Sequence, residues 1–260
     1  MAEFDGWSAY YDFIHKGLPG EVEFYVGQAL RYGGETLELG CGTGRVCIPM
    51  AMSGGLVTGL DLSMGMLQVC REKAAALGTL RGALSLLCGD MRAFALSRRF
   101  RFIAMPYRTF MHLLTPEEQL RCLRCVHGHL DPEGVFALNL CAPRAATVAR
   151  FSGREGADAF QLVGAYPVPD EGITLVHFHA AHYDEYRQWI VERHRIQEKD
   201  ASGTVVHEET LTLTRAYSSP REMEHLLYRS GFEADALLGG FDGIPFGEDS
   251  TEMIWVLRKR

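Results

Sequence analysis

The first 140 residues alternate between short apolar runs and longer segments in which apolar residues recur every three or four positions. Segment 21–32 is of the second kind, and one helical face of it holds Val22, Tyr25, Val26, Ala29 and Leu30. The apolar runs, which we interpret as strands, are 36–39, 56–60, 83–88, 100–105 and 135–140. Further helical segments follow at 43–52, 63–77 and 116–130. This order predicts a parallel sheet with helices on both faces.

Residues at the segment ends support these assignments. Ser63 is suited to cap helix 63–77, and Thr115 with Pro116 is a typical helix start. Pro49 must lie near the first turn of helix 43–52 or kink it. The sequence Asp-Pro-Glu-Gly at 131–134 predicts a turn before the strand 135–140.

The pattern changes after Pro143. Three long extended segments are predicted at 173–181, 186–198 and 204–214, with a hairpin turn at 200–203. A helix at 221–230, ended by Gly231, and strands at 234–238 and 253–257 follow. We therefore expect one α/β domain, 1–260, with an inserted antiparallel β appendage. Its expected parts are N-terminal cap helices (1–33), a ligand-binding half (34–142), the inserted strands (158–216) and the elements that complete the sheet (217–260).

Composition and charge narrow the classes of partner. The chain has a formal charge of −7 and no dense stripe of Lys and Arg, which argues against nucleic acid. No apolar run approaches the roughly 18 residues that a membrane helix needs. The N-terminus has early acidic residues and no basic-then-apolar order, so no signal peptide is expected. The seven cysteines are an odd number, and most, such as Cys88, lie in apolar segments, which predicts unpaired, buried thiols in a cytoplasmic protein.

The stretch TLELGCGTGR, residues 36–45, places three glycines directly after a strand. A strand, a glycine-rich turn and a helix in this order are typical of a nucleotide-like ligand. Gly40, Gly42 and Gly44 are spaced too closely for the dinucleotide pattern G-x-G-x-x-G. Gly44 is followed by Arg-Val rather than by the Lys-Ser/Thr of a phosphate-binding loop. The glycines alone are also compatible with a tight turn that binds nothing.

Acidic residues at the ends of the next strands distinguish these possibilities. Asp61, at the end of the second strand, is placed to accept the two hydroxyls of a ribose. Asp90, after the third strand, is placed to accept from an exocyclic amine such as that of adenine. With Glu38 these acids would repel phosphates but accept a cationic adenosine. S-adenosylmethionine, a sulfonium with an amino-acid tail, is such a cofactor.

Four segments in this order, ETLELGCGTGR, GLDLSMGML, LLCGDMRAF and HLDPEGVFAL, resemble the class I S-adenosylmethionine-dependent methyltransferases. Within that superfamily the chain is similar to small-molecule methyltransferases related to amino-sugar N,N-dimethyltransferases. The segment YYDFIHKG, the inserted strands and the C-terminal segment carry this second resemblance. The resemblance implies a seven-stranded sheet whose last strand is antiparallel.

The resemblance also implies the residues of the cofactor site. Those that match are Tyr11, Glu38, Gly40, Cys41, Gly42, Gly44, Asp61, Leu62, Met66, Gly89, Asp90, Met91 and Met105. Tyr11 lies on an N-terminal segment that would close over the cofactor and reach its carboxylate or the substrate; simple packing is the other interpretation of this residue. S-adenosylhomocysteine would be the product that remains.

The acceptor side is expected at the end of the fourth strand. The candidates for contact with a substrate are Tyr11, Tyr107, Arg108, His112 and Asn139. Tyr107 and His112 are the candidate catalytic residues, with His112 as a general base, although methyl transfer to a neutral amine needs no base before attack. Packing or local capping is the alternative role of His112.

Two histidine- or cysteine-rich patterns suggest a metal, but we predict none. His177 and His179 share one face of a strand, yet Ala181 stands where the pattern H-x-H-x-D-H has its aspartate. A solvated strand face or the substrate rim explains them better. Cys122 and Cys125, with His127 and His129, lie within a helix and have no second cysteine pair.

Taken together, the sequence predicts a methyltransferase that acts on a small-molecule amine or hydroxyl by in-line transfer, mainly through proximity and orientation. Two other functions stay open. One is a cofactor-binding scaffold without transfer activity, and the other is a protein methyltransferase. In either case the inserted strands are a candidate homodimer surface.

Overall fold

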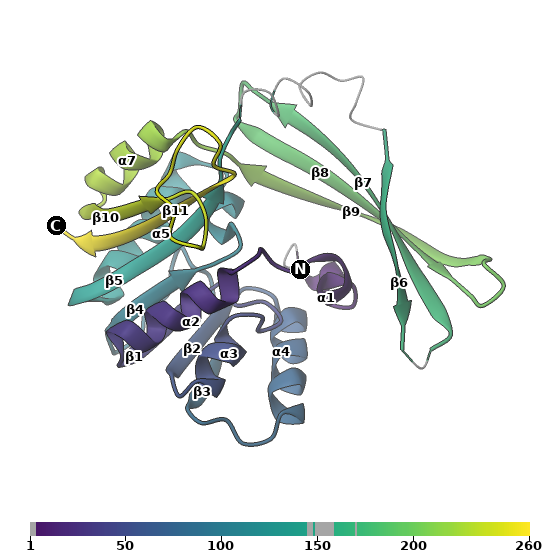
Figure 1. Cartoon of the computed structure of the whole chain (residues 1–260), viewed down its shortest axis with the longest axis horizontal. Helices are drawn as coiled ribbons and strands as arrows, with labels where there is room; N and C mark the ends of the chain where they lie inside the picture. The colour runs from purple at the N-terminus through teal and green to yellow at the C-terminus, as the bar shows by residue number, and fades with distance from the viewer. Residues whose placement is uncertain (1–3, 145–147, 149–158, 170) are drawn as a thin grey trace.

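A computed structural model describes residues 4–144, 148, 159–169 and 171–260. The described chain forms a seven-stranded sheet flanked by helices and a separate four-stranded sheet, with the N-terminal segment between them (Figure 1). This arrangement confirms the predicted α/β fold with an antiparallel β insertion. The expected boundary residues 1–3 and 158 lie outside the described residues.

The seven-stranded sheet has the order β10-β11-β5-β4-β1-β2-β3. Strands β1 to β5 are mutually parallel where they pair, and β11 is antiparallel to both β5 and β10, as predicted. The strands span Glu35–Leu39 (β1), Leu56–Asp61 (β2), Ala83–Cys88 (β3), Phe100–Met105 (β4), Leu130–Cys141 (β5), Phe232–Leu238 (β10) and Glu252–Lys259 (β11). The strand order reverses between β1 and β4, so a crevice opens beyond the carboxyl ends of these two strands.

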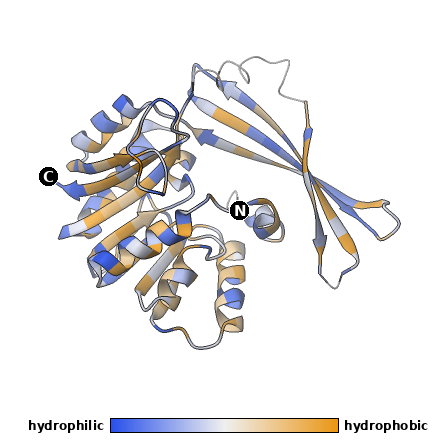
Figure 2. Cartoon of the chain, in the orientation of Figure 1, coloured by the Kyte–Doolittle hydropathy of each residue, from blue (hydrophilic) through white to orange (hydrophobic). Residues whose placement is uncertain are grey.

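Two helical layers cover the sheet. The helices are α2 (Glu21–Tyr32), α3 (Cys47–Met52), α4 (Met64–Ala76), α5 (Pro116–His129) and α7 (Pro220–Arg229). Residues of α2, α3 and α4 belong to one buried cluster, and those of α5 and α7 belong to another on the opposite face. Apolar residues concentrate on the central strands, whereas blue, hydrophilic residues mark α2 and α7 (Figure 2). None of the described helices combines the length and apolar character that crossing a membrane requires.

Local hydrogen bonds explain where several helices begin. The hydroxyl of Ser63 accepts from the N–H of Met66, and that of Thr115 accepts from the N–H of Glu118, which confirms both predicted caps. Ser219 caps α7 in the same way, within a capping box that the sequence analysis did not identify.

The second sheet has the order β6-β7-β8-β9 and is antiparallel throughout. Its strands are β6 (Gln161–Val168), β7 (Ile173–Asp184), β8 (Trp189–Lys199) and β9 (Val205–Ala216). The sequence analysis missed β6 because Gly164 and Pro167 interrupt its pattern, and both residues weaken a strand prediction. Pro167 is tolerated because β6 is an edge strand.

Two smaller predictions were wrong. The turn expected at 131–134 is part of β5, where the pairing with β4 shifts register between Phe100 and Phe102. Cys88 is exposed rather than buried, because β3 is the edge strand of its sheet. All seven cysteines are free thiols.

The N-terminal segment contains η1 (Asp5–Trp7) and α1 (Tyr11–Ile14). Asp5 accepts a hydrogen bond from the Ser63 hydroxyl at 2.7 Å, and Asp12 accepts one from the Thr43 hydroxyl at 2.7 Å. The Tyr10 hydroxyl donates to Glu198 of β8 at 2.9 Å. The segment is thus joined to both sheets and covers the crevice between them.

Candidate functional site

A cavity of about 490 Å³ lies where the strand ends, the N-terminal segment and the second sheet meet. Its lining includes most of the residues predicted for the site: Tyr11, Gly40, Gly42, Asp61, Leu62, Met66, Gly89, Asp90, Met91, Tyr107, Arg108 and His112. A smaller cavity of about 30 Å³ adjoins it and is lined by Glu38 and Cys41, among others. Gly44, Met105 and Asn139 line neither cavity.

The glycine loop follows β1 and has three left-handed residues, with φ values of +68° at Gly40, +53° at Gly42 and +88° at Gly44. A Cβ at Gly44 would lie 2.5 Å from Sγ of Cys70, so this glycine is required for packing under the loop. Gly42, in contrast, lines the cavity, and its N–H donates to Oδ2 of Asp61 at 2.8 Å. The loop thus presents bare backbone to the cavity.

Asp61, at the end of β2, is held in place by the backbone. Its Oδ1 accepts from the N–H of Ser63 at 2.8 Å while its Oδ2 accepts from Gly42. Burial raises the pKa of this carboxyl, although the backbone hydrogen bonds oppose the shift. Each oxygen keeps a lone pair, so the carboxylate can accept two further hydroxyl groups from a ligand in the cavity.

Asp90 lies beside Arg92, whose Nε donates to its two oxygens at 2.9 and 3.0 Å. These side-chain hydrogen bonds hold the pKa of Asp90 below its usual value. Asp90 therefore stays ionised, and it remains an acceptor on the wall of the cavity.

Glu38 is a buried carboxyl at the end of β1. Its Oε2 has no hydrogen-bond partner among the described residues, and desolvation raises its pKa well above the usual value. A buried carboxylate oxygen without a partner is costly. A cationic group that entered the small cavity would supply the missing partner.

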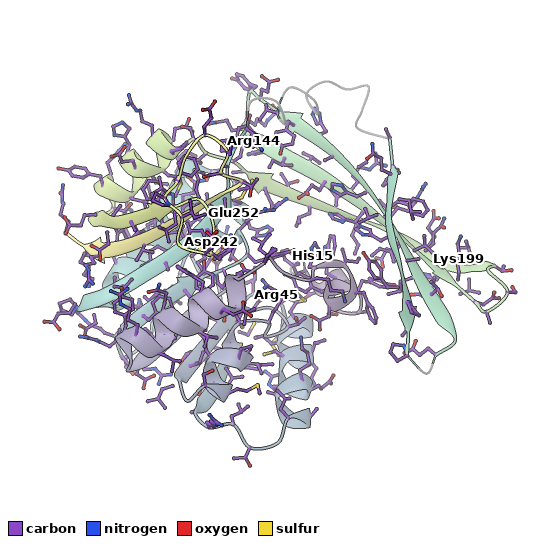
Figure 3. All side chains as sticks on the ribbon, in the orientation of Figure 1. His15, Arg45, Arg144, Lys199, Asp242 and Glu252 are labelled. Atoms are coloured by element: carbon purple, nitrogen blue, oxygen red, sulfur yellow. The ribbon has the colours of Figure 1, made fainter. Side chains whose placement is uncertain are left out.

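The loop after β4 is held in an unusual conformation by buried ion pairs. Tyr107 and Arg108 have positive φ values of +53° and +65°. The carboxylate of Glu21 accepts from the N–H of Tyr107 at 2.7 Å and from Arg45 at 2.6 Å. His15 and Arg45 both contact the Tyr107 ring, and Figure 3 shows them between the two sheets.

Two predicted positions lie away from the cavity, and a third is bonded within the protein. Arg108 lines the cavity, but its guanidinium is bonded to Glu252, with Nε 3.1 Å from Oε1. Asn139 is fully buried and donates to the same Glu252 at 2.9 Å, and it lies outside the cavity lining. Met105 is buried in the core because its side chain points toward the α5 and α7 layer.

The two candidate catalytic residues, Tyr107 and His112, contact His15 and Phe4 of the N-terminal segment, respectively. Burial lowers the pKa of His112 to about 3 and that of His15 to about 4. The Tyr107 hydroxyl lies 3.5 Å from Nδ1 of His15, and burial raises the pKa of Tyr107. At neutral pH these imidazoles are neutral and weak bases.

The second sheet contributes a polar wall that the sequence analysis only partly found. Its residues in the cavity include His177 and His179 from β7, Glu192 and His194 from β8, and Arg215 from β9. We call these five residues the histidine wall. His179 pairs directly with His194 across the strands, and Ala181 with Glu192. His182 lies on the other face because side chains alternate along a strand. His177 and His179 of the motif at 177–182 thus line the cavity, and their role as a substrate rim stays a prediction.

Arg215 holds the carboxylate of Glu192 within the histidine wall, because its Nε donates to Oε2 of Glu192 at 2.8 Å. Burial alone would raise the pKa of Glu192, but His179 and Arg215 hold it well below its usual value. Burial lowers the pKa of His194 to about 3 and that of His177 to about 4. The wall therefore presents the Glu192 carboxylate, the Arg215 guanidinium and neutral imidazoles at His177 and His194.

Comparison with known proteins places this site in context. Residues 36–134 match a family model described as a methyltransferase domain. The cypemycin N-terminal methyltransferase of a Streptomyces species is 28% identical over 228 residues, which is 88% of this chain and 84% of that protein.

Two solved structures are similar over almost the whole chain. The CcbJ methyltransferase of Streptomyces caelestis has a TM-score of 0.81 at 24% identity, covering 99% of this chain and 97% of its own. The S-adenosylmethionine-bound CalS10 of Micromonospora echinaspora, an amino pentose methyltransferase of calicheamicin biosynthesis, has a TM-score of 0.68 at 22% identity, covering 99% and 98%.

Proposed function

We propose that this class I S-adenosylmethionine-dependent methyltransferase transfers its methyl group to the nitrogen of a small-molecule amine. The cofactor supplies a methyl group on a sulfonium, which is already a good leaving group. The protein then has to bind, orient and exclude water rather than activate the donor.

The described residues fit this cofactor. Asp61 would accept the ribose hydroxyls, and Asp90 with Met91 would meet the edge of the adenine, next to Leu62 and Met66. The unpartnered oxygen of Glu38 would receive the cationic amino group of the methionine tail. Gly40 and Gly42 leave room for close approach, and Tyr11 covers the cavity from the N-terminal segment.

The observation that favours an amine over a hydroxyl is the weak basicity of the groups near the β4 loop. Transfer to a hydroxyl benefits from a base that takes the proton early, and a base is most effective with a pKa near the working pH. The pKa of His112 is about 3 and that of His15 about 4. A neutral amine attacks through its lone pair and loses a proton afterwards, so it needs no such base. In this proposal His112 and Tyr107 shape the acceptor space.

The names of the similar proteins support the same choice, because one acts on an N-terminus and another on an amino pentose. The acceptor class is tested by incubating the enzyme with S-adenosylmethionine and a matched panel of amino sugars, peptides with free N-termini, and phenols. Mass spectrometry should detect N-methylated amines and S-adenosylhomocysteine. Methylation confined to the phenols would contradict the proposal, and cofactor binding without any transfer would favour a scaffold.

Location and assembly are also proposals. A cytoplasmic location is supported by the seven free thiols. A homodimer through the inserted sheet is supported by exposed apolar residues on its edge strands, such as Leu162 and Val206. Light scattering of the purified protein would measure the mass of the assembly.

A further inference from the structure

The histidine wall contains buried polar atoms that lack a partner. His194 is only 5% exposed, and its Nε2 has no hydrogen-bond partner among the described residues. Its other ring nitrogen, Nδ1, lies 3.0 Å from Nε2 of His177. Because buried polar atoms are almost always satisfied and His194 lines the cavity, its orphaned nitrogen indicates a ligand.

A carboxylate lies close to that imidazole. Glu192, His194 and His179 each offer one possible ligand atom, and these three atoms lie within 4.8 Å of one another. Arg215 binds Oε2 of Glu192, and His179 lies 3.3 Å from Oε1. The carboxylate is thus held by Arg215 and His179, and Glu192 and His194 both line the cavity.

We propose that Glu192 Oε1 and His194 Nε2 accept the two N–H groups of a neutral primary amine and so direct its lone pair away from the histidine wall, toward the cofactor. This inference rests on the proposed function and names the wall that positions its acceptor. In the tautomer that it requires, Nδ1 of His194 donates to His177, and the lone pair on Nε2 is available.

The charges around the two residues suit a neutral amine better than a metal ion. The cation of Arg215, bound to the Glu192 carboxylate, opposes a divalent ion at this position.

The geometry has a chemical consequence for the transfer step. The nitrogen lone pair forms the new N–C bond while the C–S bond breaks and its electron pair stays on sulfur. The nitrogen becomes an ammonium, and the adjacent Glu192 carboxylate stabilises the developing charge. The product then loses a proton to water. Each methylation removes one N–H, so a tertiary amine has none left for the wall and is released.

A binding experiment tests this without requiring turnover. The probes are aniline, N-methylaniline and N,N-dimethylaniline, which are uncharged at neutral pH and offer two, one and no N–H groups. Titration into the enzyme saturated with S-adenosylhomocysteine should show aniline binding at least about tenfold more tightly than N,N-dimethylaniline, because two hydrogen bonds are lost and one alone contributes about that factor. The added methyl groups favour binding through apolar contact, so they work against the expected order.

Substitutions at Glu192 and His194 test whether these two residues cause the preference for aniline. Glu192→Gln and His194→Phe should each reduce the preference for aniline toward unity while leaving the affinity for S-adenosylhomocysteine unchanged. The matched controls Glu224→Gln and His207→Phe, at exposed positions outside the cavity, should preserve it. Thermal melting establishes that each variant is folded.

Three results would overturn the inference. Equal binding of the three anilines by the wild-type enzyme would do so, as would a preference that survives both cavity variants. Stoichiometric Zn²⁺ binding that the same two substitutions abolish would assign the cluster to a metal instead. Failure of the proposed function has a separate signature, which is the absence of N-methylated product in the acceptor panel.

Discussion

At the scale of single residues, three acidic side chains determine the chemistry proposed for the cavity. Asp61, Glu38 and Glu192 each lie at or near the cavity, but their partners differ. Asp61 is stabilised by backbone N–H groups and Glu192 by Arg215, whereas one oxygen of Glu38 has no partner among the described residues. An acid kept in this costly state is typical of a binding function.

Glu38→Gln should therefore raise the stability of the apo protein at high pH and weaken its binding of S-adenosylhomocysteine. Burial raises the pKa of Glu38 well above its usual value, so folding favours the protonated form. The stability of the wild-type apo protein should then fall as pH rises above the unfolded pKa of about 4.3. The glutamine variant should lack this component and be more stable at pH 8 in urea unfolding.

The same variant should bind S-adenosylhomocysteine at least about tenfold more weakly, because a charge-assisted hydrogen bond is lost. Glu35→Gln, at an exposed ion pair with Arg98, is the matched control and should change neither property strongly. A glutamine variant that is less stable at pH 8 and binds as tightly as wild type would refute this role of Glu38.

At the scale of elements, the side chain of Glu21 links α2 to the loop after β4 through a hydrogen bond. Glu21 is fully buried at the start of α2 and bonds both Arg45 and the backbone of Tyr107. This link holds the positive φ values of Tyr107 and Arg108 at the cavity wall. A strained loop persists only where its surroundings determine it.

Glu21→Ala should destabilise the protein by about 3 kcal/mol, because it leaves Arg45 largely buried without its counter-charge. Glu23→Ala, on the exposed face of the same helix, should remain within about 0.5 kcal/mol of wild type. The midpoint of urea unfolding measures both values. Equal midpoints for the two variants would show that the Glu21 link contributes no net stability.

At the scale of the whole molecule, one cavity is built from two sheets joined through the N-terminal segment. The α/β half was predictable from the sequence because its signals are local: apolar runs, caps at Ser63 and Thr115, and glycines after β1. Asp61 and Asp90 were predictable for the same reason, since each follows its own strand. Strand β6 lacked a clear local signal because of Gly164 and Pro167.

The histidine wall was not predictable in full. The approach of His194 and Glu192 to His179 depends on the register between β7 and β8, which no local pattern specifies. The bonds of Arg108 and Asn139 to Glu252 could not be anticipated, because Glu252 comes more than a hundred residues after both. The residues proposed to recognise the acceptor are thus assembled by tertiary pairing.

The most direct test of the central claim is calorimetric titration with S-adenosylhomocysteine. The wild-type protein should bind it with one-to-one stoichiometry, and Asp61→Ala should weaken binding by at least about tenfold, because the carboxylate that would hold the ribose is removed. Asp235→Ala, at an exposed ion pair on β10, should bind like wild type. No binding by the wild-type protein at millimolar ligand, or equal affinity for Asp61→Ala, would contradict the account.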